Sequence, residues 1–190
     1  MTLLSHSEDN LVRCPWPGKD ELYIRYHDEE WGLEVRGDQA IFERLTLEGF
    51  QAGLSWITIL KRRETFRVAF RGFDLESVAA FDSEDVERLM NDPGIIRNRL
   101  KVLSAIKNAQ LILQMQSQGQ SISDLIWSFA PPAHLRAEAH YATDTTSPES
   151  EAMSKALKKL GFGFVGPTTM FALMQAIGLV DGHSASCFKR

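Results

Sequence analysis

Cysteine is scarce in this chain of 190 residues, which contains only Cys14 and Cys187. Two cysteines cannot form the disulfide framework that stabilises many small secreted proteins. The first ten residues also lack the basic start and the apolar stretch of a secretory signal. Together, these absences predict a cytoplasmic protein.

Long apolar runs and a positive net charge are also absent. The longest apolar run is only a few residues, which excludes a membrane-spanning helix and predicts no membrane partner. The net charge of −4 argues against general nucleic-acid binding. The basic residues nevertheless cluster in 60–71, 97–101 and 155–161, and a local basic face is enough to bind a phosphate backbone. The alternative is that each cluster is a solvated helix face.

Alternating patterns long enough to require a β-strand are missing, whereas helical signals are abundant. The predicted helices cover residues 38–50, 53–70, 82–92, 95–119, 121–132, 147–161 and 167–178. We expect Asp38 and Ser147 to be N-caps, Gly161 to end its helix, and Gly49 and Gly53 to separate the first two helices. The sequence therefore predicts an all-α fold. The chain is long enough for one large domain or two small lobes.

Two segments do not follow this helical pattern. Residues 130–146 form one long irregular connection, and such loops commonly link lobes or carry function. The segment 21–32 contains Tyr23, Tyr26 and Trp31 among several acids, although the whole chain has only three tyrosines and four tryptophans. This segment fits either a strand with one decorated face or the wall of a pocket.

Each cysteine lies at a short spacing from a histidine. Twelve residues separate Cys14 from His27, and three separate His183 from Cys187. The second spacing places both side chains on one face of a helical turn. Two thiolates and two imidazoles complete the tetrahedral shell of a structural zinc ion, which would join the two ends of the chain. The spacing leaves open the alternative of two buried thiols and two incidental histidines.

A short turn between the last two predicted helices contains three glycines, namely Gly161, Gly163 and Gly166. Glycine permits positive φ and close approach by another backbone. The amides of Gly166, Thr168 and Thr169 lie at a helix N-terminus, where an anion is favoured. With Lys158 and Lys159 beside it, the turn predicts a phosphate clamp that reads no base. The alternative is an ordinary corner between two helices, and a Walker-type loop is excluded because its Gly-Lys-Ser/Thr ending is missing.

Several specific sequence blocks follow one another between Cys14 and Cys187. They are "YHDEEWG", "LEGFQAGLSWITILKRRE", "DPGIIRNRLKV", "KALKKLGFGFVGPTT" and "MQAIGLVDGH". In this order they closely resemble the 3-methyladenine DNA glycosylase I family of the helix-hairpin-helix superfamily. The resemblance implies an all-α, two-lobed glycosylase fold in which a zinc site joins the N- and C-terminal segments.

The resemblance also implies a domain arrangement and a ligand set. Residues 1–12 are expected to be an N-terminal extension, and 13–190 a single glycosylase domain. Its central lobe would cover about 33–130, and its terminal lobe about 13–32 plus 145–190. The family's zinc ligands fall on Cys14, His27, His183 and Cys187.

The active site implied by the resemblance is an aromatic pocket with one carboxylate. The catalytic groups fall on Glu48, Tyr26 and Trp56, with Glu48 recognising the base. The pocket walls fall on Trp16, Tyr23, Tyr26, Trp31 and Trp56. 3-Methyladenine attached to deoxyribose is positively charged and leaves as a neutral base, so it needs little acid catalysis. Aromatic faces and a carboxylate hold such a cation more strongly than they hold neutral adenine.

The resemblance further implies a repair glycosylase acting on alkylated double-stranded DNA. The turn Leu160–Gly166 matches the family's anchor for the DNA backbone. The enzyme would flip the damaged nucleotide out of the duplex, and we expect Leu54 to fill the gap as an apolar wedge. No lysine stands where a lyase nucleophile is expected, which predicts release of free 3-methyladenine without strand cleavage. We expect the enzyme to act as a monomer.

Two positions depart from the family pattern. Asp181 and Gly182 stand where relatives typically have Asn and then Asp before the first C-terminal zinc histidine. Asp181 either supports an oxocarbenium-like sugar or belongs to a turn that leads to His183. Phe50 stands where Gln is common, and it either alters the pocket rim or repacks it.

Other functions stay open at this level. The first is a zinc-stabilised DNA-binding module without catalysis, which would not need Glu48 among aromatic residues. The second is a glycosylase with altered specificity for alkylated bases. The third is a small-molecule enzyme that binds another cation, which would not need the glycine turn and its lysines.

Overall fold

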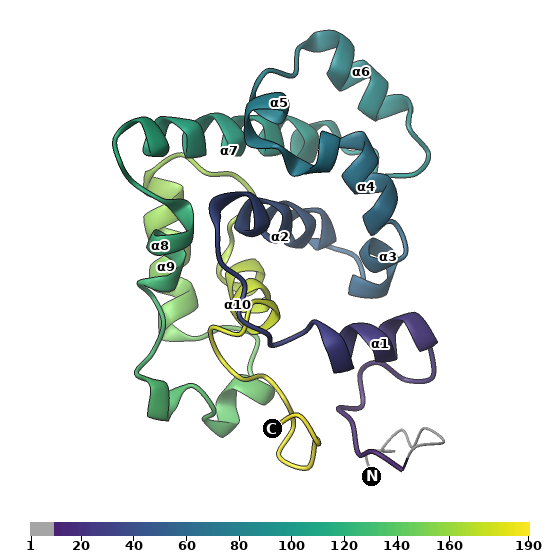
Figure 1. Cartoon of the computed structure of the whole chain (residues 1–190), viewed down its shortest axis with the longest axis vertical. Helices are drawn as coiled ribbons and strands as arrows, with labels where there is room; N and C mark the ends of the chain where they lie inside the picture. The colour runs from purple at the N-terminus through teal and green to yellow at the C-terminus, as the bar shows by residue number, and fades with distance from the viewer. Residues whose placement is uncertain (1–9) are drawn as a thin grey trace.

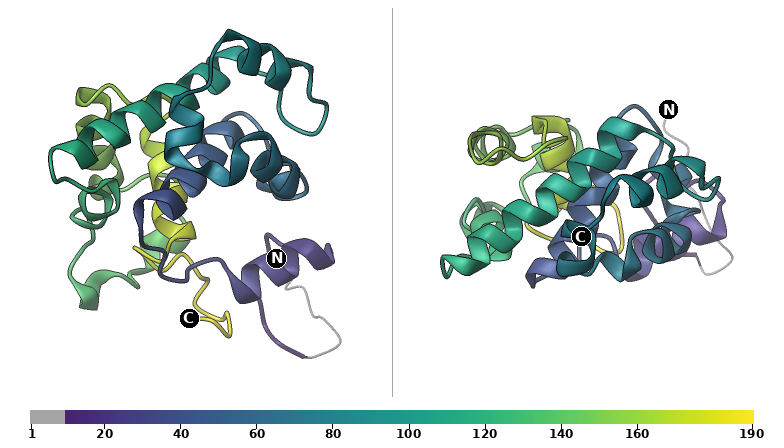
Figure 2. Two further views of the ribbon diagram at one scale, coloured as in Figure 1. Left: turned by 45° about the horizontal axis from the view of Figure 1, so that its top comes forward. Right: turned by 90° about the horizontal axis from the view of Figure 1, so that it is seen from above.

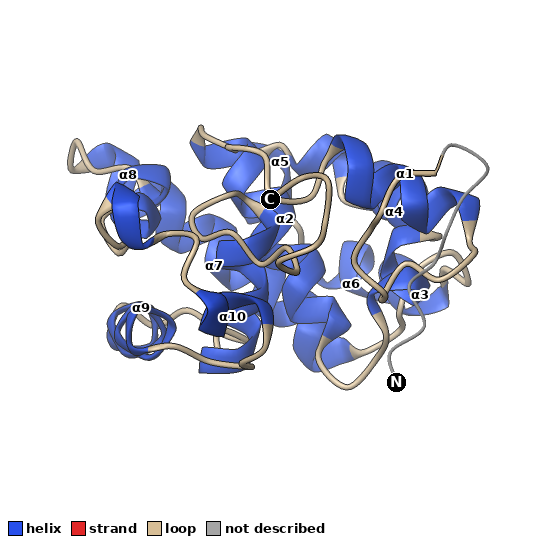
Figure 3. Ribbon diagram, turned by 90° about the horizontal axis from the view of Figure 1, so that it is seen from below, coloured by secondary structure: helices blue, strands red, loops and turns tan. Residues whose placement is uncertain are grey.

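The computed structural model describes residues 10–190, and most of the expected extension at 1–12 lies outside this range. The described residues form ten α-helices and three short 3-10 turns, without a β-strand (Figure 3). None of these helices is long and apolar enough to span a membrane. The predicted all-α fold class is confirmed.

The helices follow one another with short connections. They are α1 (Glu21–Glu29), α2 (Asp38–Gln51), α3 (Trp56–Leu60), α4 (Arg63–Ala69), α5 (Leu75–Ala79), α6 (Ser83–Asn91), α7 (Arg99–Ser117), α8 (Ile122–Trp127), α9 (Pro148–Lys159) and α10 (Pro167–Ala176). The 3-10 turns are η1 (Arg71–Phe73), η2 (Ala133–Leu135) and η3 (Ala139–Ala142).

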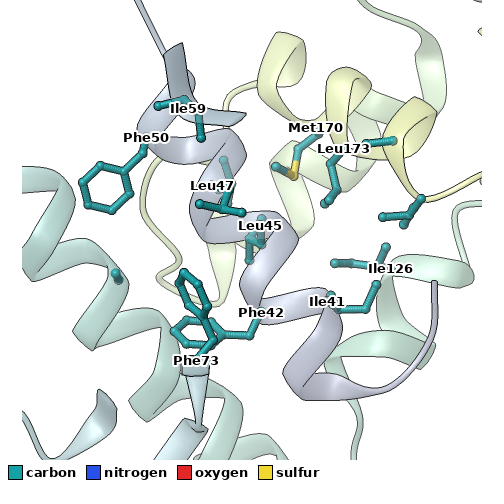
Figure 4. Packing of buried hydrophobic residues seen from close by; sticks show 14 of the residues in the cluster. Ile41, Phe42, Leu45, Leu47, Phe50, Ile59, Phe73, Ile126, Met170 and Leu173 are labelled. Atoms are coloured by element: carbon teal, nitrogen blue, oxygen red, sulfur yellow. The ribbon is translucent and has the colours of Figure 1, made fainter. Parts of the chain in front are cut away.

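Helix α2 lies at the centre of the molecule and is surrounded by other helices (Figure 1). Every residue from Leu45 to Phe50 is buried, so the helix has no solvent face over these six residues. Met170 and Leu173 of α10 face α2 on one side, and Phe73 packs against Phe42 on another (Figure 4). Most of the hydrophobic core is therefore built around this one helix.

The beginning and end of α2 differ from the prediction. Gly37 is the N-cap, while Asp38 is the first helical residue, and its carboxylate accepts hydrogen bonds from Ser121 Oγ and Ser123 N. Gly49 does not interrupt the helix, which continues to Gln51. A glycine fits here because Phe164 packs closely against it: a β-carbon on Gly49 would lie 3.3 Å from Phe164 Cβ.

The other predicted helices are mostly correct, with shifted boundaries. The segment 53–70 forms two helices, α3 and α4, in place of the single expected one. Helix α7 begins at Arg99 rather than 95, because the Asn98 side chain caps it. Ser147 caps α9 as predicted and forms a reciprocal capping box with Ser150.

Most of the segment 21–32 is helical, because α1 covers Glu21–Glu29, and the sequence pattern did not show this helix. Asp20 caps α1 by accepting a hydrogen bond from Tyr23 N. The chain around α1 lies close to the C-terminal segment (Figure 2), and Phe188 N donates to Val12 O at 2.8 Å. The two ends of the described chain therefore meet in one part of the molecule.

Candidate functional site

A cavity of about 280 Å³ opens between α1, α2, α3 and α10. It is lined by Trp16, Tyr23, Tyr26, Trp31, Glu48, Gln51, Trp56, Ala142, Ala172, Gln175 and Gly182. All six residues that the sequence places in the pocket lie in this lining. The structure thus brings them together, and their chemical roles remain predictions.

Helix α1 supplies two walls of the cavity from one face. Tyr23 and Tyr26 are three residues apart, which is the spacing that aligns side chains along a helix. Trp31 follows the C-cap of the helix, Glu30. Trp16 packs against the same face, with its ring centre 4.7 Å from that of Tyr23 and 5.0 Å from that of Trp31. Trp56 completes the wall from α3, with its ring centre 5.4 Å from that of Tyr26. The result is a box of tilted and edge-on aromatic rings.

Glu48 places a carboxyl group at the base of this aromatic box. Its exposed fraction is 4%, and its Oε2 atom has no hydrogen-bond partner among the described residues. Burial raises the pKa of Glu48 to about 8, although the charge of Arg44 opposes this shift. The indole Nε1 of Trp56 is likewise buried without a partner in this part of the chain. An unpaired donor and acceptor in one cavity are suited to a polar ligand, because leaving them unpaired costs about 1–3 kcal/mol each.

An ion-pair cluster lies near the same carboxyl group. Arg63 donates two hydrogen bonds to Glu30, at 2.5 and 2.8 Å, and Arg44 approaches the same carboxylate at 3.4 Å. Burial opposes ionisation of Glu30, but the Arg63 guanidinium outweighs it and leaves the pKa of Glu30 below its usual value. Glu30 therefore offsets one of the two positive charges close to the cavity.

Five lining residues were missed from the sequence, namely Gln51, Ala142, Ala172, Gln175 and Gly182. Ala142 belongs to the irregular connection 130–146, and Gln175 Nε2 ties that connection to α10 through a 2.6 Å hydrogen bond to Tyr141 O. Gly182 has a packing role, since a β-carbon there would lie 2.7 Å from Gln175 Nε2 and 2.9 Å from the Trp31 ring. The sequence indicated that the connection 130–146 either links lobes or carries function, but it carried no signal for the individual lining residues.

A second cluster lies directly behind the aromatic box. The ligand atoms of Cys14, His27 and Cys187 all lie within 4.8 Å of one another. His183 is next to them, with its ring centre 5.2 Å from that of His27, and its buried Nε2 has no partner among the described residues. Two buried thiols and two imidazoles are a donor set of the kind that binds structural zinc.

Two aspartates orient the imidazoles of this cluster. Asp28 lies 2.7 Å from His27 Nδ1, and Asp181 lies 2.7 Å from His183 Nδ1. Each carboxylate thus leaves Nε2 available as a ligand atom, in the arrangement found around zinc-bound histidines. Burial lowers the pKa of both imidazoles and raises that of the Cys14 thiol.

The structure also bears on the two departures from the family pattern. Asp181 contacts His183 through both its ring and its backbone amide, at 2.7 and 2.9 Å, and it is not in the cavity lining. Phe50 is 1% exposed and packs against Phe66 and Phe70. It belongs to the core and does not form the pocket rim.

The residues expected at DNA lie outside the cavity. Lys158, Lys159 and Thr168 are exposed around the turn between α9 and α10, and Gly166 caps α10 without any side-chain hydrogen bond to the free amides. Leu54 is 42% exposed in the loop after α2. Their contacts with DNA remain predictions.

Comparison with known proteins gives consistent matches over nearly the whole chain. A family model described as methyladenine glycosylase matches residues 16–190. DNA-3-methyladenine glycosylase 1 of Escherichia coli (strain K12) is 49% identical over 179 residues, covering 93% of this chain and 96% of that protein. The chain is thus similar to a curated glycosylase along almost its full length.

Solved structures agree with this result. A crystal structure of 3-methyladenine DNA glycosylase I matches with a TM-score of 0.88 and 46% identity, covering 93% of this chain and 98% of that chain. A variant of 3-methyladenine DNA glycosylase I, solved in complex with 3-methyladenine, matches with a TM-score of 0.83 and 36% identity, covering 93% of this chain and 96% of that chain.

The buried Glu48 carboxyl predicts a pH-dependent stability that Glu48→Gln removes. The folded protein keeps a proton up to about pH 8, whereas a carboxyl with the ordinary pKa of 4.5 loses it earlier. The contribution of Glu48 to stability is therefore full below the unfolded pKa and is lost as the pH rises through the folded pKa. The glutamine variant gains on the order of a few kcal/mol over wild type across this window. Urea unfolding of both proteins at several pH values between 4.5 and about 8 measures this gain. A difference in unfolding free energy that does not change with pH would contradict the prediction.

Proposed function

Since the chain belongs to the methyladenine glycosylase family, we propose that it removes 3-methyladenine from alkylated DNA by hydrolysing the bond between base and deoxyribose. It is a DNA-3-methyladenine glycosylase of base-excision repair. One observation carries the assignment in this chain: the Glu48 carboxyl is buried without a partner among aromatic rings. This is the arrangement that holds a flat cationic base.

The reaction needs recognition of the base more than acid catalysis. In hydrolysis, the electron pair of the glycosidic bond goes to the base, while a water molecule forms the new bond to the sugar carbon and releases one proton to the solvent. Because methylated adenine starts as a cation, it leaves neutral and requires no added proton. Glu48 in its ionised form would accept a hydrogen bond from the amino group, while Trp16, Tyr26 and Trp56 contact the ring faces and edges.

Burial favours the uncharged form of Glu48, because it raises the pKa of this carboxyl to about 8. A cationic base supplies the missing counter-charge and lowers that pKa, so binding and ionisation are coupled. Neutral adenine supplies no such charge. Selection of the alkylated base would therefore rest on the cost of burying an unpaired carboxylate.

Base extrusion from double-stranded DNA is the second part of the proposal. The exposed Leu54 lies in the loop directly after α2, which carries Glu48. An apolar wedge here would fill the stack while the nucleotide enters the cavity. The turn 160–166 would hold the backbone through the free amides at the start of α10, with Lys158 and Lys159 adding charge.

A structural zinc ion is the third part. Cys14, His27, His183 and Cys187 would hold it, and its chemistry would be to pin the two ends of the chain together. The buried, unpartnered Nε2 of His183 and the two orienting aspartates support this assignment. His27 and His183 also pack edge-on against Trp16 and Trp31, so the ion would support the wall of the base pocket.

Other features of the proposal follow from the sequence. We expect a monomer that acts in the cytoplasm, and the free 3-methyladenine base is the product. No lysine lines the cavity among the described residues, in keeping with base release without strand cleavage.

Glu48→Gln tests the proposed function directly. It removes the carboxylate charge, so release of free 3-methyladenine from methylated duplex DNA should fall by about tenfold to a hundredfold, the worth of a charged hydrogen bond. Chromatography of the released base measures the rate. Glu43→Gln on the same helix, which pairs with Arg67 outside the cavity, is the matched control and should stay close to wild type. No release by the wild-type protein would contradict the proposed function.

Leu54→Ala tests the wedge. Single-turnover excision from duplex DNA should slow, because the gap left by the flipped nucleotide is no longer filled. Affinity for free 3-methyladenine, followed by tryptophan fluorescence, should stay unchanged since Leu54 is outside the cavity lining. An unchanged excision rate would rule out Leu54 as the wedge.

Elemental analysis tests the metal site. The purified protein should contain about one zinc per chain, as expected for a single tetrahedral site. His183→Gln should reduce that content and lower the melting temperature, and it should weaken binding of free 3-methyladenine through the shared wall. His134→Gln, at an exposed histidine, should leave all three unchanged. A wild-type protein without bound metal would refute the site.

A further inference from the structure

Lys101 on α7 is a buried lysine for which the reaction described above has no use. Only 7% of its surface is exposed, so it is not available for a direct contact with a DNA phosphate. No ion pair joins its ammonium to a carboxylate among residues 10–190, and burial lowers its pKa. A lysine buried in this way is costly unless its charge is satisfied.

The ammonium is satisfied by backbone carbonyls at the end of α2. Lys101 Nζ donates to Phe50 O at 2.8 Å and to Ala52 O at 2.7 Å. These carbonyls lie at the C-terminus of the helix, where a positive charge is favoured. Ala52 is the C-cap of α2 and belongs to the loop Gln51–Leu54. Lys101 therefore holds the base of the loop that presents Leu54.

The same ammonium faces the turn between α9 and α10. It lies 5.7 Å from the centre of the Phe164 ring, within range of a cation–π contact. Phe164 has a φ of +55°, an unfavourable value for this residue type. A β-carbon on Gly49, the residue after Glu48, would lie 3.3 Å from Phe164 Cβ. The tip of the turn thus packs on the helix that carries the base-recognising carboxyl.

A row of polar residues on α7 completes this junction. Asn108 accepts a hydrogen bond from Gly163 N at 3.0 Å and donates one to Gly163 O at 3.2 Å. A β-carbon on Gly163 would collide with Ser104 Oγ, so the turn lies directly on the helix. Asn108 fixes the turn, and Lys101, two turns earlier, fixes the loop.

We infer that Lys101 is a positioning residue for base extrusion, because its ammonium sets the loop Gln51–Leu54 relative to the turn 160–166. The inference rests on the proposed function and deepens it. If the turn grips the backbone while Leu54 enters the stack, the distance between the two segments decides whether the wedge meets the gap. Lys101 bonds one segment and faces the other, so its loss lets them move independently.

The test combines Lys101→Met with Leu54→Ala. Methionine keeps most of the side-chain volume but leaves both carbonyls without their charged donor. Single-turnover excision from methylated duplex DNA should fall by about tenfold or more, the worth of a hydrogen bond to a charged group. Binding of free 3-methyladenine should remain as in wild type. In the Leu54→Ala background, Lys101→Met should have little further effect, because both changes act on the same wedge.

Lys107→Met is the matched control for charge. Lys107 is exposed on the same helix, and its Nζ lies 3.7 Å from where a β-carbon on Gly161 would be. Its loss removes a surface charge but leaves the two carbonyl contacts at the loop Gln51–Leu54 intact, so the single-turnover rate at saturating enzyme should stay at the wild-type value. Lys101→Arg retains the charge and the donors, so it should recover most of the rate and serves if the methionine variant does not fold.

Three results would overturn the inference. The first is an excision rate in Lys101→Met that equals the wild-type rate. The second is a double variant in which the rate losses of Lys101→Met and Leu54→Ala multiply fully, and the third is a loss of free-base affinity in Lys101→Met that matches its loss of rate. If wild-type protein releases no base, the proposed function itself fails. Wild-type release with any of the three results overturns the role of Lys101 alone.

Discussion

The burial of α2 around its whole circumference is the constraint on which the structure depends. The residues from Leu45 to Phe50 are all buried, so a carboxyl group among them is buried by the core itself. The helices that supply the hydrophobic core thereby also desolvate Glu48. Burial of this unpaired carboxyl costs folding energy, and in the proposed function a cationic base would recover that cost on binding.

The two ends of the chain contribute the opposite wall. Trp16 and Trp31 pack against the imidazoles of His27 and His183, so the aromatic box and the cysteine–histidine cluster have a common partition. Asp28 and Asp181 orient those imidazoles from behind. This explains part of the acidic character of the segment after His27: Asp28 serves His27, and Glu30 pairs with Arg63 near Glu48.

The two segments proposed to contact DNA, the loop after α2 and the turn before α10, are both held by α7. This helix holds the loop after α2 with Lys101 and the turn before α10 with Asn108. Both hydrogen-bonding groups are buried side chains whose partners are backbone atoms far away in sequence. Such contacts leave no periodic or compositional trace, so nothing in the spacing of residues around Lys101 indicates them.

The sequence by itself determined the helical fold class, the capping of α9 by Ser147 and the residue types of the pocket, because these depend on local propensity and on specific motifs. It misjudged α1 as a non-helical segment, since three aromatic or histidine side chains obscured the helical period. Tertiary structure decided the rest. Gly49 remains helical because Phe164 covers it, Phe50 belongs to the core, and Asp181 contacts His183. The first two outcomes depend on partners distant in the chain, Phe164 for Gly49 and Phe66 and Phe70 for Phe50, and packing selects those partners. The third depends on the local turn that places Asp181 beside His183.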